Sequence, residues 1–162
     1  MQINGWTILA HPLFLTQFND VVTAVEEAKS KDPDGYKKTP NAKLLADIVE
    51  ITARRIPADP TDKRYRQGTT LGGDYKHWFR DKFGNGRFRL FFRYDSASKV
   101  IVYVWVNNED TKRTYGAKDD AYAVFKRMLD SGNPPDGWQK LLSECIGMDA
   151  VLEIAKALSQ PE

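Results

Sequence analysis

Apolar positions in the first part of the chain follow a helical period. A short apolar run at 6–10 predicts a strand that ends at His11-Pro12. Pro12 suits the first turn of a helix. The apolar residues of 14–25 then recur every three or four positions, which predicts an amphipathic helix as far as Lys31.

A second helix is predicted after a loop rich in Asp, Pro and Gly. Apolar residues at 44–52 keep the helical spacing, Asn41 is a suitable N-cap, and Pro57 is expected to stop the helix. Two helices joined by a short loop predict an αα-hairpin.

The period changes in the middle of the chain. Residues 59–70 are polar and irregular, with a short strand expected near Tyr65. Strands are predicted at 76–83 and 87–94, on either side of a Gly-Asn-Gly turn. After a second turn, residues 100–106 are apolar at every position, as in a strand that is covered on both faces.

The C-terminal part returns to helical spacing. Asp119 is predicted to cap a helix that Gly132 and two prolines close, and the tail at 138–158 is expected to be helical. The order is strand, two helices, a meander of strands, then helices. This order predicts an α+β fold in which helices are segregated from a small antiparallel sheet.

Composition restricts the class of protein. The chain has 162 residues, of which 41% are hydrophobic and 12% aromatic, so a folded domain is expected and a disordered chain is excluded. Its single cysteine, Cys145, cannot form an intrachain disulfide. No apolar run reaches the roughly 18 residues of a membrane helix, and no signal peptide is recognisable, so we expect no membrane and a cytoplasmic location.

Charge is distributed unevenly along the sequence. The formal net charge is +2, but residues 54–93 contain 11 basic and 4 acidic side chains, a net charge of +7. The flanking parts of the chain are slightly acidic. The middle of the chain is therefore a cationic block.

Strand alternation places the cations of this block on one side of the predicted hairpin. A turn with an even number of residues puts Lys82 opposite Arg87, and Arg80 opposite Arg89, on a common face. That register also places Trp78 opposite Phe91. The complete predicted face contains Lys76, Trp78, Arg80, Lys82, Arg87, Arg89, Phe91 and Arg93.

Such a face has two interpretations. An ordinary charge run is a solvated surface, but here only Asp81 lies among six basic residues, and like charges directly opposite each other destabilise a ladder. Arginine suits forked phosphate contacts, and aromatic side chains between cations suit base stacking. We therefore interpret this face as a polyanion-binding surface.

Other sites receive little support from the sequence. His11 and His77 are isolated and there is no Cys-x-x-Cys, so we expect no metal. The glycine-rich stretch 68–73 lacks the Gly-Lys-Ser/Thr of a phosphate loop, so no cofactor is predicted. His77 remains an alternative proton shuttle beside the hairpin.

Three motifs, in order, resemble the YhaV toxins of bacterial toxin–antitoxin modules, within the RelE-like ribonuclease superfamily. They are WFRDKFGNGRFRLFFRY, NEDTKRTYG and GNPPDGW, and the resemblance extends over residues 4–138. It implies a RelE-like domain at 1–138, with a strand and helical hairpin packed on a small antiparallel sheet. Residues 139–162 would then be a C-terminal helical extension.

The resemblance also implies partners. A PrlF-type antitoxin with an AbrB-like domain is expected, together with mRNA, usually in the ribosome. The complex of toxin and antitoxin is a candidate for binding operator DNA.

Superfamily members cleave RNA without metal by attack of the ribose 2′-OH. The motifs carry over to Arg80, Lys82, Arg89, Arg113 and Tyr115 as catalytic candidates. Guanidinium groups suit the stabilisation of the phosphorane, and the neighbouring cations favour the neutral amine of Lys82 as a base. Arg113 or Tyr115 would then protonate the leaving group or stack on a base.

Three functions remain open from the sequence. The first is an endoribonuclease toxin. The second is an RNA- or ribosome-binding protein that uses the same cations without chemistry, and the third is a transcriptional co-repressor acting with the antitoxin. Lys76, Trp78, Arg87, Phe91 and Arg93 are the predicted RNA-binding residues.

Overall fold

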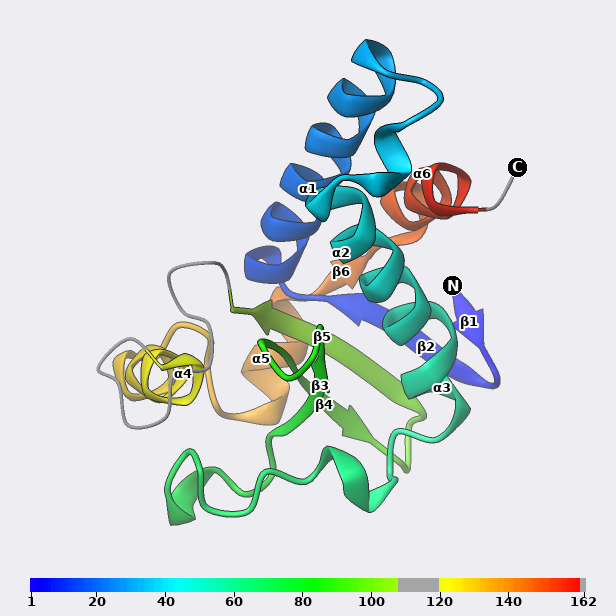
Figure 1. Ribbon diagram of the computed structural model, residues 1–162. Coiled ribbons are helices and arrows are strands. Elements are labelled where there is room, and N and C mark those ends of the chain that lie inside the picture. Colours follow the sequence, from blue (N-terminus) through cyan, green and yellow to red (C-terminus); the bar gives the residue numbers. More distant parts are fainter. Residues whose placement is uncertain (108–119, 161–162) are drawn as a thin grey trace.

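The computed structural model describes residues 1–107 and 120–160, and it places helices on both faces of one sheet (Figure 1). The predicted Arg113 and Tyr115 lie outside the described residues. The strands are β1 (Gln2–Ile3), β2 (Trp6–Ala10), β3 (Phe79–Phe83), β4 (Phe88–Asp95), β5 (Val100–Val106) and β6 (Ile146–Gly147). The longer helices are α1 (Pro12–Lys31), α2 (Pro40–Glu50), α4 (Ala121–Ser131), α5 (Trp138–Glu144) and α6 (Asp149–Ser159).

The sheet is mixed, whereas the sequence predicted a purely antiparallel sheet. Its strand order is β1-β2-β5-β4-β3, with β6 also paired to β2. β2 and β5 run parallel, and the other pairs are antiparallel. A parallel pair requires a long crossover connection, which the helical hairpin and the β3–β4 hairpin supply here.

The predicted first strand and the first helix are confirmed, and their junction is capped. His11 is the N-cap of α1, and its Nδ1 accepts a hydrogen bond from the backbone N–H of Leu13 at 3.2 Å. The N-cap of α2 is Thr39, whose hydroxyl accepts from the backbone N–H of Ala42, so the prediction of Asn41 was wrong. Pro40 occupies the first helical position, which makes the residue before it the cap.

The second helix continues past its predicted end. A π-helical turn, η2 (Ile51–Arg55), joins α2 to the short α3 (Ile56–Ala58), so Pro57 lies inside the last turn. The turn carries Arg55, which donates to the carboxylate of Asp81 on β3 through Nε at 2.9 Å and Nη2 at 2.5 Å. Burial raises the pKa of Asp81, and Arg55 opposes that rise. This ion pair fastens the helical hairpin to β3.

Residues 59–78 form 3₁₀ turns where a strand was expected. They are η3 (Lys63–Tyr65) and η4 (Gly73–Tyr75). The only strand-like contact described in this segment is a single bridge from Arg66 to Phe79. The polar composition of the segment explains why it lies along the edge of the sheet without joining it.

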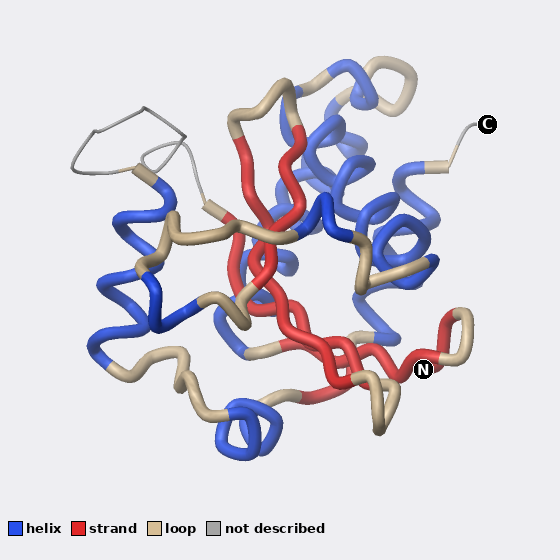
Figure 2. Tube along the Cα trace, turned by 90° about the horizontal axis from the view of Figure 1, so that it is seen from below, coloured by secondary structure: helices blue, strands red, loops and turns tan. Residues whose placement is uncertain are grey.

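Helices cover both faces of the sheet, which corrects the expected segregation (Figure 2). One core lies between the sheet and α1, α2 and α6, with Phe14, Leu45 and Leu152 buried in it. The other lies between the sheet and α4 and α5, with Phe91 and Phe125 buried in it. The sheet and the described helices on its two faces thus make three layers.

Residues 138–160 pack into this structure as helices, as predicted, with one addition. β6 pairs with β2 at Leu9 and Ala10. The hydroxyl of Tyr36 donates to the carbonyl of Leu158 at 2.8 Å, which ties α6 to the helical hairpin.

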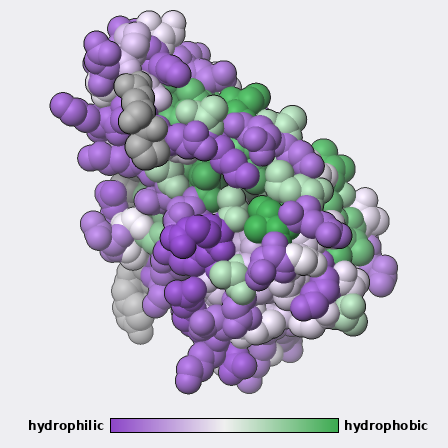
Figure 3. Space-filling view, turned by 90° about the vertical axis from the view of Figure 1, so that its right-hand side faces the viewer, coloured by the Kyte–Doolittle hydropathy of each residue, from purple (hydrophilic) through white to green (hydrophobic). Residues whose placement is uncertain are grey.

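Apolar side chains reach the surface among hydrophilic ones on the face shown in Figure 3. In the described ranges, no helix combines the length and the apolar character needed to cross a membrane.

Candidate active site

Strands β3 and β4 bring their cations to one face, as the alternation predicts. Lys82 pairs with Arg89, and Arg80 with Phe91. The turn comprises Gly84 to Arg87, so it has an even number of residues, but the register is shifted by two from the predicted one. Gly84, Asn85 and Gly86 have φ of 62°, 59° and 80°, a left-handed backbone that extends the turn as far as Arg87.

Helix α4 covers much of this face. Arg80 is only 9% exposed and Arg89 only 7%, whereas Lys82 is exposed. The expected open cationic surface is therefore a partly closed site. Its cover is held in place by the apolar core between α4 and the sheet.

Tyr122, on the first turn of α4, lies between the two arginines. Its hydroxyl oxygen accepts from Nε of Arg80 at 2.8 Å and from Nε of Arg89 at 3.3 Å. The Arg89 guanidinium also lies over the Tyr122 ring, 5.5 Å from its centroid. Asp120 caps α4 by accepting from the backbone N–H of Tyr122, so the cap predicted at Asp119 is one residue away from the observed one.

Backbone carbonyls hold the outer ends of the same arginines. Nη1 of Arg80 donates to the carbonyl of Arg64 at 2.9 Å, and Nη1 of Arg89 donates to the carbonyl of Gly86. Within the described residues, neither guanidinium has a carboxylate partner. The acceptors described for these two buried cations are therefore one hydroxyl and two backbone carbonyls.

The two arginines change the acidity of Tyr122. Burial, the largest single influence, raises the pKa of Tyr122, but the hydrogen bonds and the positive charges of Arg89 and Arg80 together lower it more, and the net shift is downward. A tyrosine with a lowered pKa yields a phenolate more readily, and such an oxygen can accept a proton. Positive charge and a proton acceptor therefore meet at one place.

Trp78, Phe91 and Arg93 do not face solvent, which corrects the expectation that they belong to an exposed face. Trp78 and Phe91 are 0% exposed. Phe91 stacks on Phe125 of α4 at 4.3 Å between ring centroids. Both aromatic residues are core residues here, because α4 and α5 cover the face on which the hairpin carries them.

Arg93 is also buried, between two tryptophans. Its guanidinium lies 5.0 Å from the Trp78 ring centroid and 5.5 Å from that of Trp138, and Nη1 donates to the carbonyl of Asp136 at 2.7 Å. Burial lowers the pKa of Arg93. This arginine stabilises the junction of the sheet with the loop before α5.

The Asp136 side chain organises the same junction. Its Oδ1 lies 2.6 Å from Nε2 of His77 and accepts from Nε1 of Trp78 at 2.7 Å. These contacts explain the Gly-Asn-Pro-Pro-Asp-Gly-Trp motif as a clamp on the chain just before β3. They also give His77, the alternative proton shuttle, a carboxylate partner of its own.

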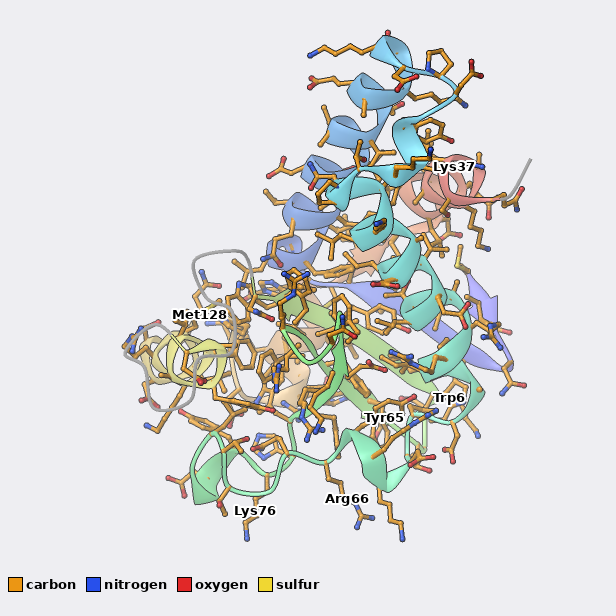
Figure 4. The ribbon with its side chains drawn as sticks, in the orientation of Figure 1. Trp6, Lys37, Tyr65, Arg66, Lys76 and Met128 are labelled. Carbon is orange, nitrogen blue, oxygen red and sulfur yellow. The ribbon has the colours of Figure 1, made fainter. Side chains whose placement is uncertain are left out.

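The remaining predicted RNA-binding residues lie apart from the arginine pair. Lys76 points away from the fold, as does Arg66 (Figure 4). Arg87 lies in the hairpin turn and lines a cavity of about 250 Å³ with residues of α2, including Lys43 and Asp47. The structure thus brings together Arg80, Lys82 and Arg89 from the predicted set.

Sequence reasoning missed Tyr122, since that residue reads as one more apolar position of an amphipathic helix. Its spacing with Phe125 and Leu129 is that of core residues, and all three side chains are buried. Only the contact between α4 and the hairpin, which are distant in sequence, distinguishes its hydroxyl. No local signal could have identified it.

The fold and the arginine pair define a class: α+β proteins whose sheet carries a partly covered pair of arginines. Within this class, the chain belongs to the YhaV toxin family. Residues 8–146 match the family Toxin_YhaV, described as a toxin with endonuclease activity, of a toxin–antitoxin system. The protein is therefore the endonuclease toxin of such a system, and an antitoxin is its partner.

Relatives from three Escherichia coli strains support this membership. They are Toxin YhaV of O6:H1, Ribonuclease toxin YhaV of K12 and Toxin YhaV of O157:H7. Each is 45% identical to this chain over 144 residues, which cover 88% of the chain and 94% of the relative. No solved structure gives a significant match.

Proposed function

We propose that this toxin is an mRNA endoribonuclease of RelE-like fold in which Arg80 and Arg89 hold the scissile phosphate. One observation carries the proposal: two nearly buried guanidiniums, from neighbouring strands, converge on the hydroxyl of Tyr122. The name of the K12 relative, a ribonuclease toxin, supports RNA as the substrate.

The proposed reaction is a transesterification within the RNA strand. The 2′-oxygen loses its proton and attacks the adjacent phosphorus, and the bond from phosphorus to the 5′-oxygen breaks. The products are a 2′,3′-cyclic phosphate and a 5′-hydroxyl that has gained a proton. The step consumes no water molecule, and the proposed mechanism uses no metal ion. Negative charge develops on the phosphorane oxygens.

The arginines match this charge. Each guanidinium is held by two acceptors, which fixes its direction before the substrate binds. Fixed donors in a partly closed site stabilise developing charge more strongly than donors in water. We assign Arg80 and Arg89 to the phosphorane.

Tyr122 and Lys82 are the proposed proton-transfer residues. The lowered pKa of Tyr122 suits the acceptance of the 2′-OH proton, and its oxygen lies beside both arginines. Lys82 is the exposed amine on the same face, opposite Arg89, and is placed to donate to the 5′-oxygen. This revises the sequence-based assignment of Lys82 as the base. Arg113 and Tyr115 stay candidates for leaving-group protonation or base stacking.

The biological setting follows from the family resemblance. We propose that the toxin acts on translated mRNA at the ribosome in the cytoplasm. Its antitoxin is of the PrlF type, with an AbrB-like domain, and the complex binds its own operator DNA. Residues 1–138 form the toxin domain proper, with 139–162 as an extension.

The test uses purified protein and a pair of oligonucleotides that differ only at one ribose. Wild type is expected to cut the all-RNA strand and to leave a 2′,3′-cyclic phosphate, and to fail where a single 2′-deoxynucleotide precedes the cleaved bond. If free RNA resists cleavage, the same pair is placed in the A site of stalled ribosomes. Cleavage of the deoxy-substituted strand at the same bond would contradict the mechanism.

Variants then locate the site. Arg89→Ala and Lys82→Ala are expected to slow cleavage by about 100-fold or more while remaining folded, and Arg66→Ala is the matched control, because that cation points away from the fold. Expression of each variant in cells, with mapping of new 5′-hydroxyl ends, extends the test to mRNA. Tight RNA binding by wild type without new ends would instead favour the non-catalytic binding function.

A further inference from the structure

The end of strand β5 carries a side-chain contact that no part of the proposed reaction uses. β4 and β5 pair at Leu90 and Val106, and β5 ends there. The next residue on β4 toward the turn is Arg89, one of the two proposed phosphate ligands. Its backbone therefore lies at the margin of the ladder.

Asn107, the residue after β5, completes the pairing with its side chain. Its Oδ1 accepts from the backbone N–H of Arg89 at 2.5 Å, and its Nδ2 donates to the carbonyl of Arg87 at 2.9 Å. The backbone N–H of Asn107 reaches the carbonyl of Arg89 only at 3.4 Å. The amide group thus replaces the backbone carbonyl that would normally accept from Arg89.

These two hydrogen bonds hold the peptide groups on both sides of Phe88. Together with the hydrogen bond from the Asn107 backbone N–H to the Arg89 carbonyl, they hold the main chain on both sides of the Arg89 side chain. Asn107 is only 2% exposed, so water competes little for the hydrogen bonds of its amide. A buried amide satisfied on both atoms rigidifies the backbone that it holds.

We propose that Asn107 is a positioning residue that aims Arg89 at the scissile phosphate. The inference rests on the proposed function, because it requires Arg89 to be a phosphate ligand. Asn107 touches neither reacting atom in this scheme. It acts through the main chain of β4, so its loss changes the geometry of Arg89 without removing a charge.

Gln17 of α1 provides a matched control on the opposite edge of β5. Its Nε2 donates to the carbonyl of Val106 at 2.6 Å, and its Oε1 accepts from the backbone N–H of Val106 at 3.0 Å. The side chain is again an amide with two hydrogen bonds to one strand end. It differs in that both of these hydrogen bonds go to β5 and neither goes to β4.

The experiment compares Asn107→Ala, Gln17→Ala and Arg89→Ala in steady-state cleavage of one RNA substrate. Asn107→Ala is expected to lower kcat by about 10- to 100-fold, because a misplaced catalytic group costs rate. Its KM should stay within about twofold of wild type, since remote phosphate contacts are retained. Gln17→Ala should keep kcat within about twofold, since it removes hydrogen bonds to β5 and none to the backbone around Arg89.

A double variant separates positioning from general stability. If Asn107 acts through Arg89, then Asn107→Ala combined with Arg89→Ala should be no slower than Arg89→Ala alone, within about twofold. A merely structural role would reduce the rate again in the double variant. Thermal melting of each variant shows whether it is folded at the assay temperature.

Asn107→Asp provides a second measurement should the alanine variant fail to fold. It keeps an oxygen for the N–H of Arg89 and loses the N–H for Arg87, so an intermediate kcat is expected. Equal rates for folded Asn107 variants and Gln17→Ala, with Arg89→Ala strongly slowed, would overturn the positioning role alone. An active Arg89→Ala would instead overturn the proposed phosphate site and the inference with it.

Discussion

The hydroxyl of Tyr122 lies 2.8 Å from Nε of Arg80, which joins helix α4 to strand β3. The contact links residues that are 42 positions apart in sequence. Because a guanidinium cannot lose its proton at ordinary pH, the tyrosine is the partner that responds to it. The positive charge of the candidate site therefore acts on the pKa of Tyr122, which is the group that can titrate.

The pH dependence of cleavage tests this titration. If the phenolate accepts the 2′-OH proton, kcat of wild type should rise with pH below the pKa of Tyr122, which lies under its ordinary value of 10. Tyr122→Phe should lose that rising limb and lower kcat by about 100-fold or more. A Phe variant with an unchanged pH profile would show that another group accepts the proton.

The same shift predicts a stability effect that is independent of catalysis. The folded-state pKa of Tyr122 is lower than the unfolded one, so the phenolate contributes stability above the unfolded pKa and that contribution disappears as pH falls through the folded pKa. The free energy of unfolding, measured with urea for wild type and for Tyr122→Phe, should therefore differ increasingly in favour of wild type as pH rises toward 10. A difference independent of pH would argue against the hydrogen-bonded phenolate.

Arg80→Lys preserves the charge and should still impair cleavage. Arg80 uses Nε for Tyr122 and Nη1 for the carbonyl of Arg64, and a single ammonium cannot make both contacts in that geometry. We expect kcat to fall by about 100- to 1000-fold, as for loss of one fixed donor. The measurement is single-turnover cleavage, and near-normal rates would mean that charge alone suffices.

Phe91→Ala should destabilise the protein and have no separate effect on RNA. The ring is 0% exposed and stacks on Phe125, so its removal leaves a cavity that costs about 3–5 kcal/mol in the free energy of unfolding. Ile154→Ala, on the surface of α6, should change it by less than about 0.5 kcal/mol. If Phe91→Leu stays folded but loses RNA affinity, then this ring contacts the substrate after all.

Arg55→Ala should destabilise the protein through Asp81. It leaves a 3% exposed carboxylate without its guanidinium, which costs about 3–5 kcal/mol. The adjacent Arg54 pairs with Glu50 on an exposed surface, so Arg54→Ala should cost less than about 1 kcal/mol. Urea unfolding gives the free energy of unfolding of both variants. Equal losses of stability would contradict the role of the Arg55–Asp81 ion pair in joining the helical hairpin to β3.

Chelation tests the metal-free reaction. With guanidiniums supplying the positive charge, cleavage of RNA should be unchanged in EDTA and should need no added divalent ion. Single-turnover rates before and after chelation, on free RNA and without ribosomes, give the comparison. Loss of activity that Mg²⁺ restores would contradict it.

The sequence predicted the elements that repeat a local period. The first strand and helix and the apolar strand β5 occur where the spacing places them, and so does the β hairpin, except that β3 begins at Phe79 and not at Lys76. Alternation also placed Arg80, Lys82 and Arg89 on one face, because the side-chain period of a strand is two whatever the turn does, provided that its length is even.

What failed depended on contacts between distant segments. The register was shifted by two because three residues of the turn have positive φ, and the parallel pairing of β2 with β5 cannot be read from either strand. Trp78, Phe91 and Arg93 looked like an exposed surface until α4 and α5 covered them. Tyr122 was missed because its helical spacing predicts a core residue. Nothing in that spacing indicates that its hydroxyl contacts arginines from distant strands.

The pairing of β6 with β2 has a practical consequence for shortened versions of this toxin. Leu9 and Ala10 have their outer edge occupied by Gly147 and Ile146. Deleting the chain from Ile146 onward would leave that edge of β2 with free hydrogen-bonding groups, which recruit strands from other molecules. A truncated toxin is thus expected to precipitate on expression, and fusion partners are better attached beyond α6 than in place of it.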